Sequence, residues 1–227
     1  MHQSTCSSER LRDFLEDFSE KYPELIEFCT RVLESRRYGG NVILMIVDAG
    51  ITSTGVNYFS VVVPRVLKFR DTFILTGEIS EVRDILSRDP DDFLKIWKNR
   101  RSYEVIRGIS EVLLRFGDGV EALRNWAFRT SLPSWRDDPM SFRGVGINTF
   151  QYLRMMGGID TVMPDRIVRS FLSHFFEVPS NSLDFIIFAE RVAREAGFRA
   201  VDLCWIAWLS KYDEERRRRY MEILSEI

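Results

Sequence analysis

Gly and Pro divide the chain into short segments in which apolar residues recur at helical spacing, and strand-like alternation is scarce. This pattern predicts helices at 8–35 with a break near Pro23, at 41–50, at 54–69 with a bend or a restart at Pro64, and at 80–87, 93–98, 102–116 and 120–129. Further helices are predicted at 147–156, 165–176, 182–196, 201–212 and 214–227. Segment 41–50 is rich in β-branched residues, but we interpret it as a buried helix. We therefore expect an all-α protein.

Length and hydropathy indicate a globular protein without a membrane span. The 227 residues suffice to form the core of one large domain or of two small ones. The longest apolar runs, at 42–47 and 185–189, are far shorter than the roughly 20 residues that a spanning helix needs. The N-terminal segment is charged and has no apolar signal core. We expect a cytoplasmic protein that is a monomer.

The cysteine and histidine content excludes several kinds of site. Cys6, Cys29 and Cys204 are far apart and have no spacing typical of metal ligands. A structural zinc or an iron–sulfur cluster held by four cysteines is therefore excluded within this chain. His2 and His174 are the only histidines, which argues against a Ser-His-Asp triad or a histidine-rich metal site.

The charge of the chain neither requires nor excludes a nucleic-acid partner. The net charge is −2 at pH 7, whereas a nucleic-acid-binding protein is often strongly basic. Backbone amides and a local basic patch can still hold a short stretch of duplex. Only five of the 32 basic residues are lysines, at positions 21, 68, 95, 98 and 211. Few amide side chains and many charged ones are typical of proteins from a thermophile.

The most informative motif lies in segment 141–172. Gly144 and Gly146 flank Val145 in a turn between helix-like segments at 140–142 and 147–156. Glycines leave backbone N–H groups uncovered, and the N-terminus of the following helix adds unpaired N–H groups and a partial positive charge. Together they form a site for phosphate oxygens that does not read base sequence. A Gly-x-Gly turn alone is also typical of an ordinary pair of antiparallel helices.

A carboxylate follows the turn by one helix. Asp165 comes directly after Pro164, at the predicted start of the next helix. In that position it can cap the helix by accepting hydrogen bonds from the first backbone N–H groups. It can also act in catalysis, and the two roles are compatible.

Segment 142–150 reads FRGVGINTF, and Asp165 follows Asn148 by 17 positions. Both features resemble the helix-hairpin-helix DNA glycosylase superfamily (HhH-GPD), in its endonuclease III-like group. The hairpin of that family reads roughly L-P-G-V-G-x-K-T-A, and a V-D-T-H-like segment lies one helix later, where this chain has MPDR at 163–166. Upstream, segment 49–57 is similar to the family's A-Q-x-T-D-x-x-V-N segment. The resemblance covers about 38–176.

For the fold, the resemblance implies a single two-lobed helical domain over 1–227. Residues 38–139 would form one helical lobe that carries the upstream match, and 140–176 would carry the hairpin and the aspartate. The flanking helices in 1–37 and 177–227 would pack together as the second lobe. The iron–sulfur loop of the family is absent from this chain, as it is in several branches of the family.

For the chemistry, the resemblance implies a DNA N-glycosylase of base excision repair, acting on double-stranded DNA with a damaged or mismatched base. Such enzymes flip the target nucleotide into a pocket between the lobes. Asp165 would stabilise the positive charge that develops on the sugar as the base leaves, or orient the attacking water. Asn148 occupies the position of the lysine that forms a Schiff base in other members, and an amide cannot form an imine. We therefore expect a monofunctional enzyme without a Schiff-base lyase step.

The resemblance also assigns further residues to roles at the DNA. Phosphate contacts are expected from Arg143, Gly144, Val145, Gly146, Ile147, Thr149, Arg166 and Arg169. Gly50, where the family often has a glutamine, and Trp135 are candidates for the base pocket or for the wedge that replaces the flipped base. The main-chain carbonyls of Met140, Phe142 and Val145 are candidates for binding a structural Na⁺ or K⁺ ion, and no other cofactor is expected. Trp205 and Trp208 lie three residues apart on an apolar segment and are expected in the core.

Two other interpretations stay open. One is a non-catalytic helix-hairpin-helix protein that binds DNA and keeps only the hairpin. The other is a helical protein without a nucleic-acid role, which the slightly acidic net charge favours. A lysine from elsewhere in the chain could supply the missing amine, but the sequence does not place Lys95, Lys98 or Lys211 near Asp165.

Overall fold

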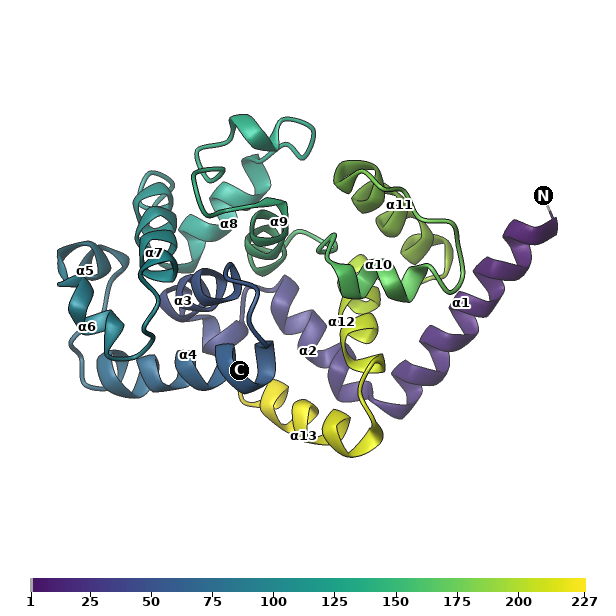
Figure 1. Ribbon diagram of the computed structural model, residues 1–227, viewed down its shortest axis with the longest axis horizontal. Coiled ribbons are helices and arrows are strands. Elements are labelled where there is room, and N and C mark those ends of the chain that lie inside the picture. Colours follow the sequence, from purple (N-terminus) through teal and green to yellow (C-terminus); the bar gives the residue numbers. More distant parts are fainter. Residues whose placement is uncertain (1) are drawn as a thin grey trace.

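The computed structural model describes residues 2–227, with side chains from Ser7 onward, and this part of the chain contains thirteen α-helices and no strand (Figure 1). The helices are α1 (His2–Lys21), α2 (Pro23–Leu33), α3 (Val42–Thr52), α4 (Val63–Phe69), α5 (Val82–Ser87), α6 (Pro90–Leu94), α7 (Arg100–Leu113), α8 (Gly119–Arg129), α9 (Ile147–Met156), α10 (Arg166–Leu172), α11 (Ser182–Glu195), α12 (Ala200–Ser210) and α13 (Glu214–Ser225). Short 3-10 or π turns lie at Arg37–Gly40, Tyr58–Val62, Arg70–Ile74 and Trp135–Asp137. The expectation of an all-α protein is confirmed.

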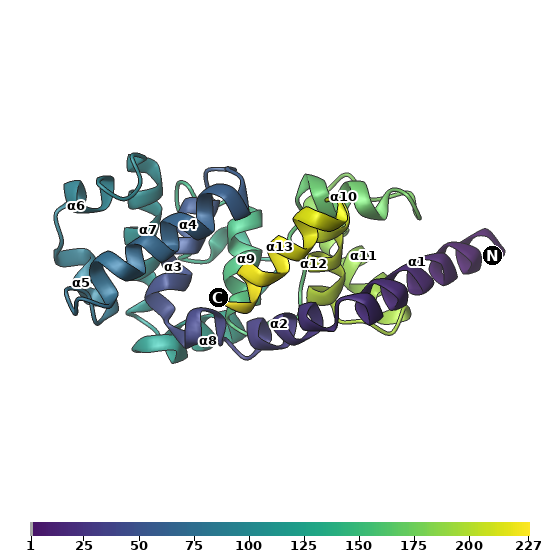
Figure 2. The same cartoon turned by 90° about the horizontal axis from the view of Figure 1, so that it is seen from below.

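The helices form two groups that α2 and α9 join (Figure 1). In one group α3 packs against α4, α7 and α8, and in the other α12 packs against α1, α10 and α11. Helix α9 contacts α2, α3 and α8. Figure 2 shows α13 lying across the middle of the molecule beside α12, while the N-terminal part of α1 projects away. The assignment of 38–139, 140–176 and the two ends of the chain to separate lobes stays a prediction.

Side-chain caps explain where several helices begin. Asn41, Asn99 and Asn181 accept hydrogen bonds from backbone N–H groups in the first turns of α3, α7 and α11. Pro64, which we expected to bend or restart its helix, lies in the first turn of α4, so a new helix starts there and the missing N–H of proline costs no hydrogen bond. The single helix expected at 54–69 is therefore a π turn at Tyr58–Val62 followed by α4.

Helix α3 lies at the centre of its group. Every residue from Val42 to Ile51 is buried, so the helix is surrounded by other elements on all sides. The interpretation of segment 41–50 as a buried helix is confirmed.

None of the described helices is long and apolar enough to cross a membrane.

The segment before the hairpin is a loop, so the expectation of a helix-like segment at 140–142 was wrong. The Oδ1 atom of Asp138 accepts hydrogen bonds from the Trp126 indole N–H at 3.0 Å and from Met140 N at 2.8 Å. The carbonyl oxygen of Asp138 also accepts one from Ser141 N at 2.8 Å. A side chain that takes up a nearby backbone N–H competes with helix formation.

Gly50 lies where α3 packs against α7. A Cβ atom there would lie 2.3 Å from Ile106 Cγ1 and 3.2 Å from the carbonyl oxygen of Ser102. Gly50→Ala is therefore expected to lower the free energy of unfolding by about 1–3 kcal/mol through overpacking. This loss exceeds the roughly 0.5–1 kcal/mol that alanine gains over glycine inside a helix.

Urea unfolding followed by circular dichroism measures the cost of Gly50→Ala. In an Ile106→Ala background the clashing Cγ1 atom is gone, and the cost should shrink or reverse. An equal cost in both backgrounds would mean that the contact between α3 and α7 does not cause the loss.

Candidate active site and nucleic-acid interface

Asp165 is a half-buried residue that caps helix α10. Its Oδ1 atom accepts hydrogen bonds from Ile167 N at 2.7 Å and from Val168 N at 3.0 Å. Its Oδ2 atom accepts the indole N–H of Trp208, on α12, at 2.9 Å. The predicted capping role of Asp165 is confirmed. The orientation of the carboxylate is thus fixed by two helices, α10 and α12.

Lys211 lies close to this carboxylate. It follows the last residue of α12, and its Nζ atom lies 4.9 Å from the ring centre of Trp208 and 4.7 Å from that of Tyr212. Asp165 and Lys211 are near enough for the charge of each to affect the pKa of the other. Sequence reasoning left Lys211 unplaced, because only the contact between α10 and α12 brings these two residues together.

Burial shifts both groups toward their uncharged forms. Burial raises the pKa of the Asp165 carboxyl, although the N–H groups that it accepts and the charge of Lys211 oppose this. Burial lowers the pKa of the Lys211 amine, and the charge of Asp165 opposes this shift. A carboxyl and an amine with pKa values displaced in this way are typical of functional sites, although structural ion networks also produce such shifts.

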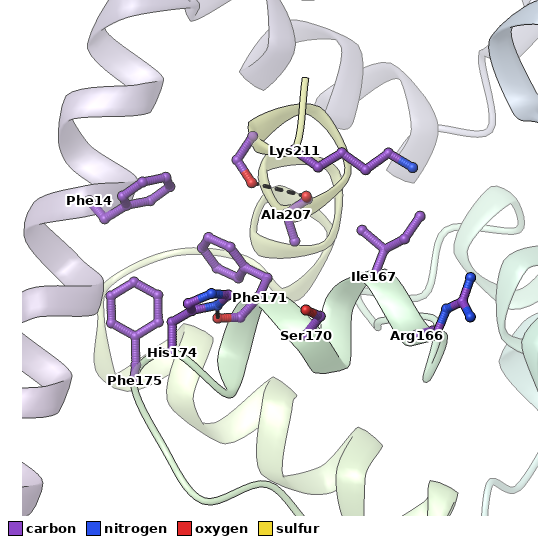
Figure 3. A pocket seen from close by; sticks show the side chains of 10 residues that line it. Phe14, Arg166, Ile167, Ser170, Phe171, His174, Phe175, Ala207 and Lys211 are labelled. Carbon is purple, nitrogen blue, oxygen red and sulfur yellow. Dashed lines mark hydrogen bonds between the residues drawn. The ribbon is translucent and has the colours of Figure 1, made fainter. Parts of the chain in front are cut away.

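A pocket of about 670 Å³ opens between α1, α10 and α12, next to the start of α10. Its surface is largely apolar, with rings from Phe14, Phe171 and Phe175 (Figure 3). Figure 3 shows the cationic ends of Arg166 and Lys211 pointing to the same side of the pocket. The pocket therefore combines an apolar wall with a cationic end close to the capping carboxylate.

The hairpin turn docks on α7. Gly144 has a φ of +106°, which favours glycine, and a Cβ atom there would lie 2.7 Å from Val105 Cγ2. The ring of Phe142 lies over Gly108, where a Cβ atom would approach it to 2.5 Å. Two glycines without side chains thus let the turn and α7 approach closely, and Val145 in the turn is buried.

The N-terminus of α9 is open at its first backbone N–H groups. Gly146 is the N-cap residue and makes no side-chain capping bond. The first N–H groups of a helix have no partner inside the helix, so they can bind an anion. Asn148 is exposed in this first turn, and Ile147 is half-buried and Thr149 buried beside it.

A set of contacts between aromatic side chains links Tyr152 on α9 to Asp165. Asn148 precedes Tyr152 by one turn of α9, but Asn148 is exposed whereas Tyr152 is buried. The hydroxyl oxygens of Tyr152 and Tyr58 are 3.4 Å apart, and the ring centres of Tyr58 and Trp208 are 6.2 Å apart. Trp208 in turn donates to Asp165. Tyr58, Tyr152 and Trp208 also line a small cavity of about 20 Å³ between these elements.

The three arginines expected to contact phosphate differ in their surroundings. Arg143 in the hairpin and Arg166 in the first turn of α10 are exposed. Arg169 instead donates from Nε to the carbonyl of Pro164 at 3.0 Å and from a terminal nitrogen to that of Pro179 at 2.7 Å. Its guanidinium thus holds α10 to the loop before α11, and fewer of its N–H groups are free for DNA.

The remaining predicted site residues lie away from the pocket beside α10. Gly50 is buried against α7, and Trp135 packs on Phe150 with ring centres 5.7 Å apart, close to the hairpin. Neither lines that pocket. Of the carbonyl groups expected to bind Na⁺ or K⁺, that of Phe142 accepts the N–H of Val145 at 3.0 Å. The roles of these residues stay predictions.

Sequence reasoning missed a buried ion pair next to the aromatic contacts. Arg37 and Asp48 are both fully buried, with a terminal guanidinium nitrogen 3.0 Å from Asp48 Oδ2. Asp48 also accepts hydroxyl hydrogen bonds from Tyr38 at 2.6 Å and from Tyr58 and Tyr152 at 3.0 Å. A single carboxylate inside the apolar run 42–51 was the signal in the sequence that could have revealed this cluster.

The ionisation of this cluster favours a charged guanidinium among neutral hydroxyls. Burial lowers the pKa of Arg37, but the tyrosines and Asp48 outweigh that effect and raise it. Burial raises the pKa of Tyr58 to about 12, and it also raises the pKa values of Tyr38 and Tyr152. The tyrosines are therefore hydrogen-bond donors to Asp48 at neutral pH.

Comparison of the chain with protein-family models, with curated proteins and with solved structures finds no match. The resemblance to helix-hairpin-helix glycosylases therefore stays an expectation from sequence motifs. Among the side chains from Ser7 onward, no group of three or more His, Cys, Asp or Glu residues is placed to hold a metal ion. Any function must accordingly be argued from the residues around Asp165 and the hairpin.

Proposed function

We propose that this protein is a DNA N-glycosylase with a two-lobed helix-hairpin-helix fold, which releases a damaged or mismatched base by hydrolysis. The observation that carries the proposal is the Asp165 carboxylate. It is half-buried, its orientation is fixed by α10 and α12, and the two residues that follow it, Arg166 and Ile167, line a pocket with a cationic end. A carboxylate held in this way can stabilise positive charge on a sugar as its base leaves.

The hairpin supports the DNA-binding part of the proposal. The uncapped N-terminus of α9 offers backbone N–H groups to a phosphate, and a Cβ atom at Gly146 would meet no atom within 4 Å, so the space beside this residue is open. Arg143 and Arg166 are exposed, so their positive charges are available to DNA phosphates. This mode of binding needs few cations, so it is compatible with a net charge of −2.

Water is the nucleophile for base release in this proposal. Asn148 is exposed at the start of α9. The nitrogen of its side-chain amide is not nucleophilic, so it cannot attack the sugar. Its carbonyl and N–H groups can position a water molecule or a phosphate instead. Base removal would then leave an abasic sugar with an intact strand.

A specific observation favours the alternative of a DNA-binding protein without catalysis. Both carboxylate oxygens of Asp165 already accept hydrogen bonds within the protein, which is what a purely structural cap requires. The same arrangement also suits a catalytic carboxylate, because fixed donors hold it in one orientation. The geometry is compatible with a structural cap and with a catalytic carboxylate, and a measurement of base release distinguishes the two roles.

The test is a panel of labelled duplexes that contain uracil, 8-oxoguanine, 3-methyladenine, hypoxanthine or a mismatch. Heating with alkali converts abasic sites into strand breaks, and we expect breaks with at least one substrate. Salt-dependent duplex binding without any base release would support the non-catalytic alternative. Absence of duplex binding even at low salt would contradict both DNA-based functions.

A further inference from the structure

The pocket between α1, α10 and α12 lies inside one of the two groups of helices and not between them. All of its lining residues come from these three helices or from the turns that directly follow α10 and α12. Its volume of about 670 Å³ is within the range of roughly 300–1,000 Å³ that is usual for pockets that bind small molecules. The chemistry of a ligand that fits the pocket therefore follows from this lining.

One end of the pocket is a wall of aromatic rings. Phe14 on α1, Phe171 on α10 and Phe175 just after α10 meet there, with ring centres 5.3–6.2 Å apart. The planes of these rings are inclined to one another by 58–64°, so they offer no pair of parallel faces between which a planar base could stack. Phe14 is still 36% exposed, although its side chain is large and apolar. The wall thus suits a flexible aliphatic chain, which gains free energy when this surface is removed from water.

Few polar groups along the wall are free to recognise a ligand. The Ser210 hydroxyl donates to the carbonyl of Ala207 at 3.0 Å, and Nδ1 of His174 lies 3.2 Å from the carbonyl oxygen of Phe171. No carboxylate is among the described residues that line the pocket. The part of the ligand that contacts the wall accordingly needs no hydrogen-bonding groups of its own.

The opposite end of the pocket carries two positive charges. Figure 3 shows the rings of Phe14 and Phe175 at one side and the cationic ends of Arg166 and Lys211 at the other. Among the side chains from Ser7 onward neither cation forms an ion pair, and the two are near enough for their like charges to interact. Both oxygens of the neighbouring Asp165 carboxylate already accept hydrogen bonds. Two cations without an ion-pair partner attract an anionic group to this end.

We propose that this pocket binds an amphipathic anion, a flexible aliphatic chain with one carboxylate or phosphate at its end. The chain lies against Phe14, Phe171 and Phe175, and the anionic group lies at Arg166 and Lys211. Arginine binds carboxylates and phosphates through two parallel N–H groups, and lysine adds a point charge. The inference does not rest on the proposed function, because it involves neither DNA nor the hairpin.

Isothermal titration calorimetry of the full chain with single-chain amphiphiles tests the chemistry of the ligand. Octanoate and decanoate are titrated below their critical micelle concentrations, and each methylene group that enters the pocket should tighten binding by about fourfold. Decyl phosphate, 1-decanol and decylammonium keep the tail and change the head group. The two anions should bind more tightly than 1-decanol, and decylammonium should bind least. The tighter of decanoate and decyl phosphate identifies the preferred anionic group.

Variants of pocket residues locate the binding site. Ser170 is exposed and lines the pocket, so Ser170→Trp should fill the pocket and abolish decanoate binding without disturbing the core. Ser173→Trp makes the same change at an exposed position at the end of α10 that does not line the pocket, and it should keep binding. Lys211→Gln should weaken decanoate binding by about two- to fivefold and leave 1-decanol binding unchanged.

Three results would overturn the inference. Equal affinities for decanoate, 1-decanol and decylammonium would mean that the cations do not select the ligand. Decanoate binding that survives in Ser170→Trp would place the ligand elsewhere on the molecule. A dimer that forms with rising protein concentration in sedimentation velocity and is lost in Ser170→Trp, without decanoate binding to the wild type, would identify the pocket as an interface between two copies of the chain. None of these measurements involves DNA, so their results are independent of the glycosylase proposal.

Discussion

Replacing Asp165 with asparagine is expected to reduce base release by about 10²–10³-fold while duplex binding survives. Asparagine keeps an oxygen that can cap α10 through Ile167 N and Val168 N, so the helix should still form. It has no negative charge to stabilise the sugar as the base leaves. Single-turnover kinetics on the active duplex measure the loss, and a gel-shift titration measures binding.

A matched control separates catalysis from capping. Asp213 caps α13 by accepting a hydrogen bond from Arg216 N at 2.9 Å, so Asp213→Asn makes the same chemical change at another helix start. It should leave base release unchanged. Trp208→Phe removes the donor to Asp165 Oδ2 but keeps the carboxylate, and an intermediate rate is expected. A fully active Asp165→Asn variant would show that the residue is only a cap.

The pH dependence of base release provides a second readout of the same carboxyl group. Because burial raises the pKa of Asp165, the rate should fall with decreasing pH at a higher pH than for an exposed aspartate. The raised pKa also means that the folded state binds this proton more tightly than the unfolded state does. The group therefore favours folding below its unfolded pKa, and this contribution is lost as the pH rises through the folded pKa. In the Asp165→Asn variant, the free energy of unfolding should not show this decrease with rising pH.

Replacing Asp48 with asparagine is expected to cost about 3–5 kcal/mol of the free energy of unfolding. The change leaves the Arg37 guanidinium fully buried without a negative partner. It also places an amide N–H₂ among hydroxyls that donate toward the same site, such as that of Tyr152 at 3.0 Å. For a chain of this length the loss corresponds to a fall in Tm of roughly 6–20 °C, measured by thermal denaturation.

Two further variants test the cause of that loss. Glu111→Gln removes the partner of Arg107 in an exposed ion pair at 3.1 Å on α7, and it should cost less than about 0.5 kcal/mol. Adding Arg37→Met to Asp48→Asn removes the buried unpaired charge and should recover part of the stability. A double variant that loses the sum of the two single effects would contradict the ion pair as the cause.

The sequence predicted much of the secondary structure because each helix carries local signals. Asp165 after Pro164 marked a helix start, and its side chain caps α10. The apolar run 41–50 was interpreted as a helix, and burial on all sides of α3 explains why no polar face marked its orientation. The prediction of a helix-like segment before the hairpin was wrong, because the side chain of Asp138 accepts a hydrogen bond from the backbone N–H of Met140. That hydrogen bond could not be inferred from periodicity.

The sequence by itself determined the all-α class, the open glycine turn and the position of Asp165 at a helix start, because propensity, capping and backbone freedom act over a few neighbouring residues. Only the tertiary structure decided what surrounds that carboxylate. Trp208 and Lys211 are more than forty positions away in the chain, and they reach Asp165 because α12 packs against α10. The Arg37 and Asp48 pair likewise depends on α9 and on the turn after α3 for its tyrosines. Long-range contacts of this kind depend on how helix faces fit together, which no local pattern specifies.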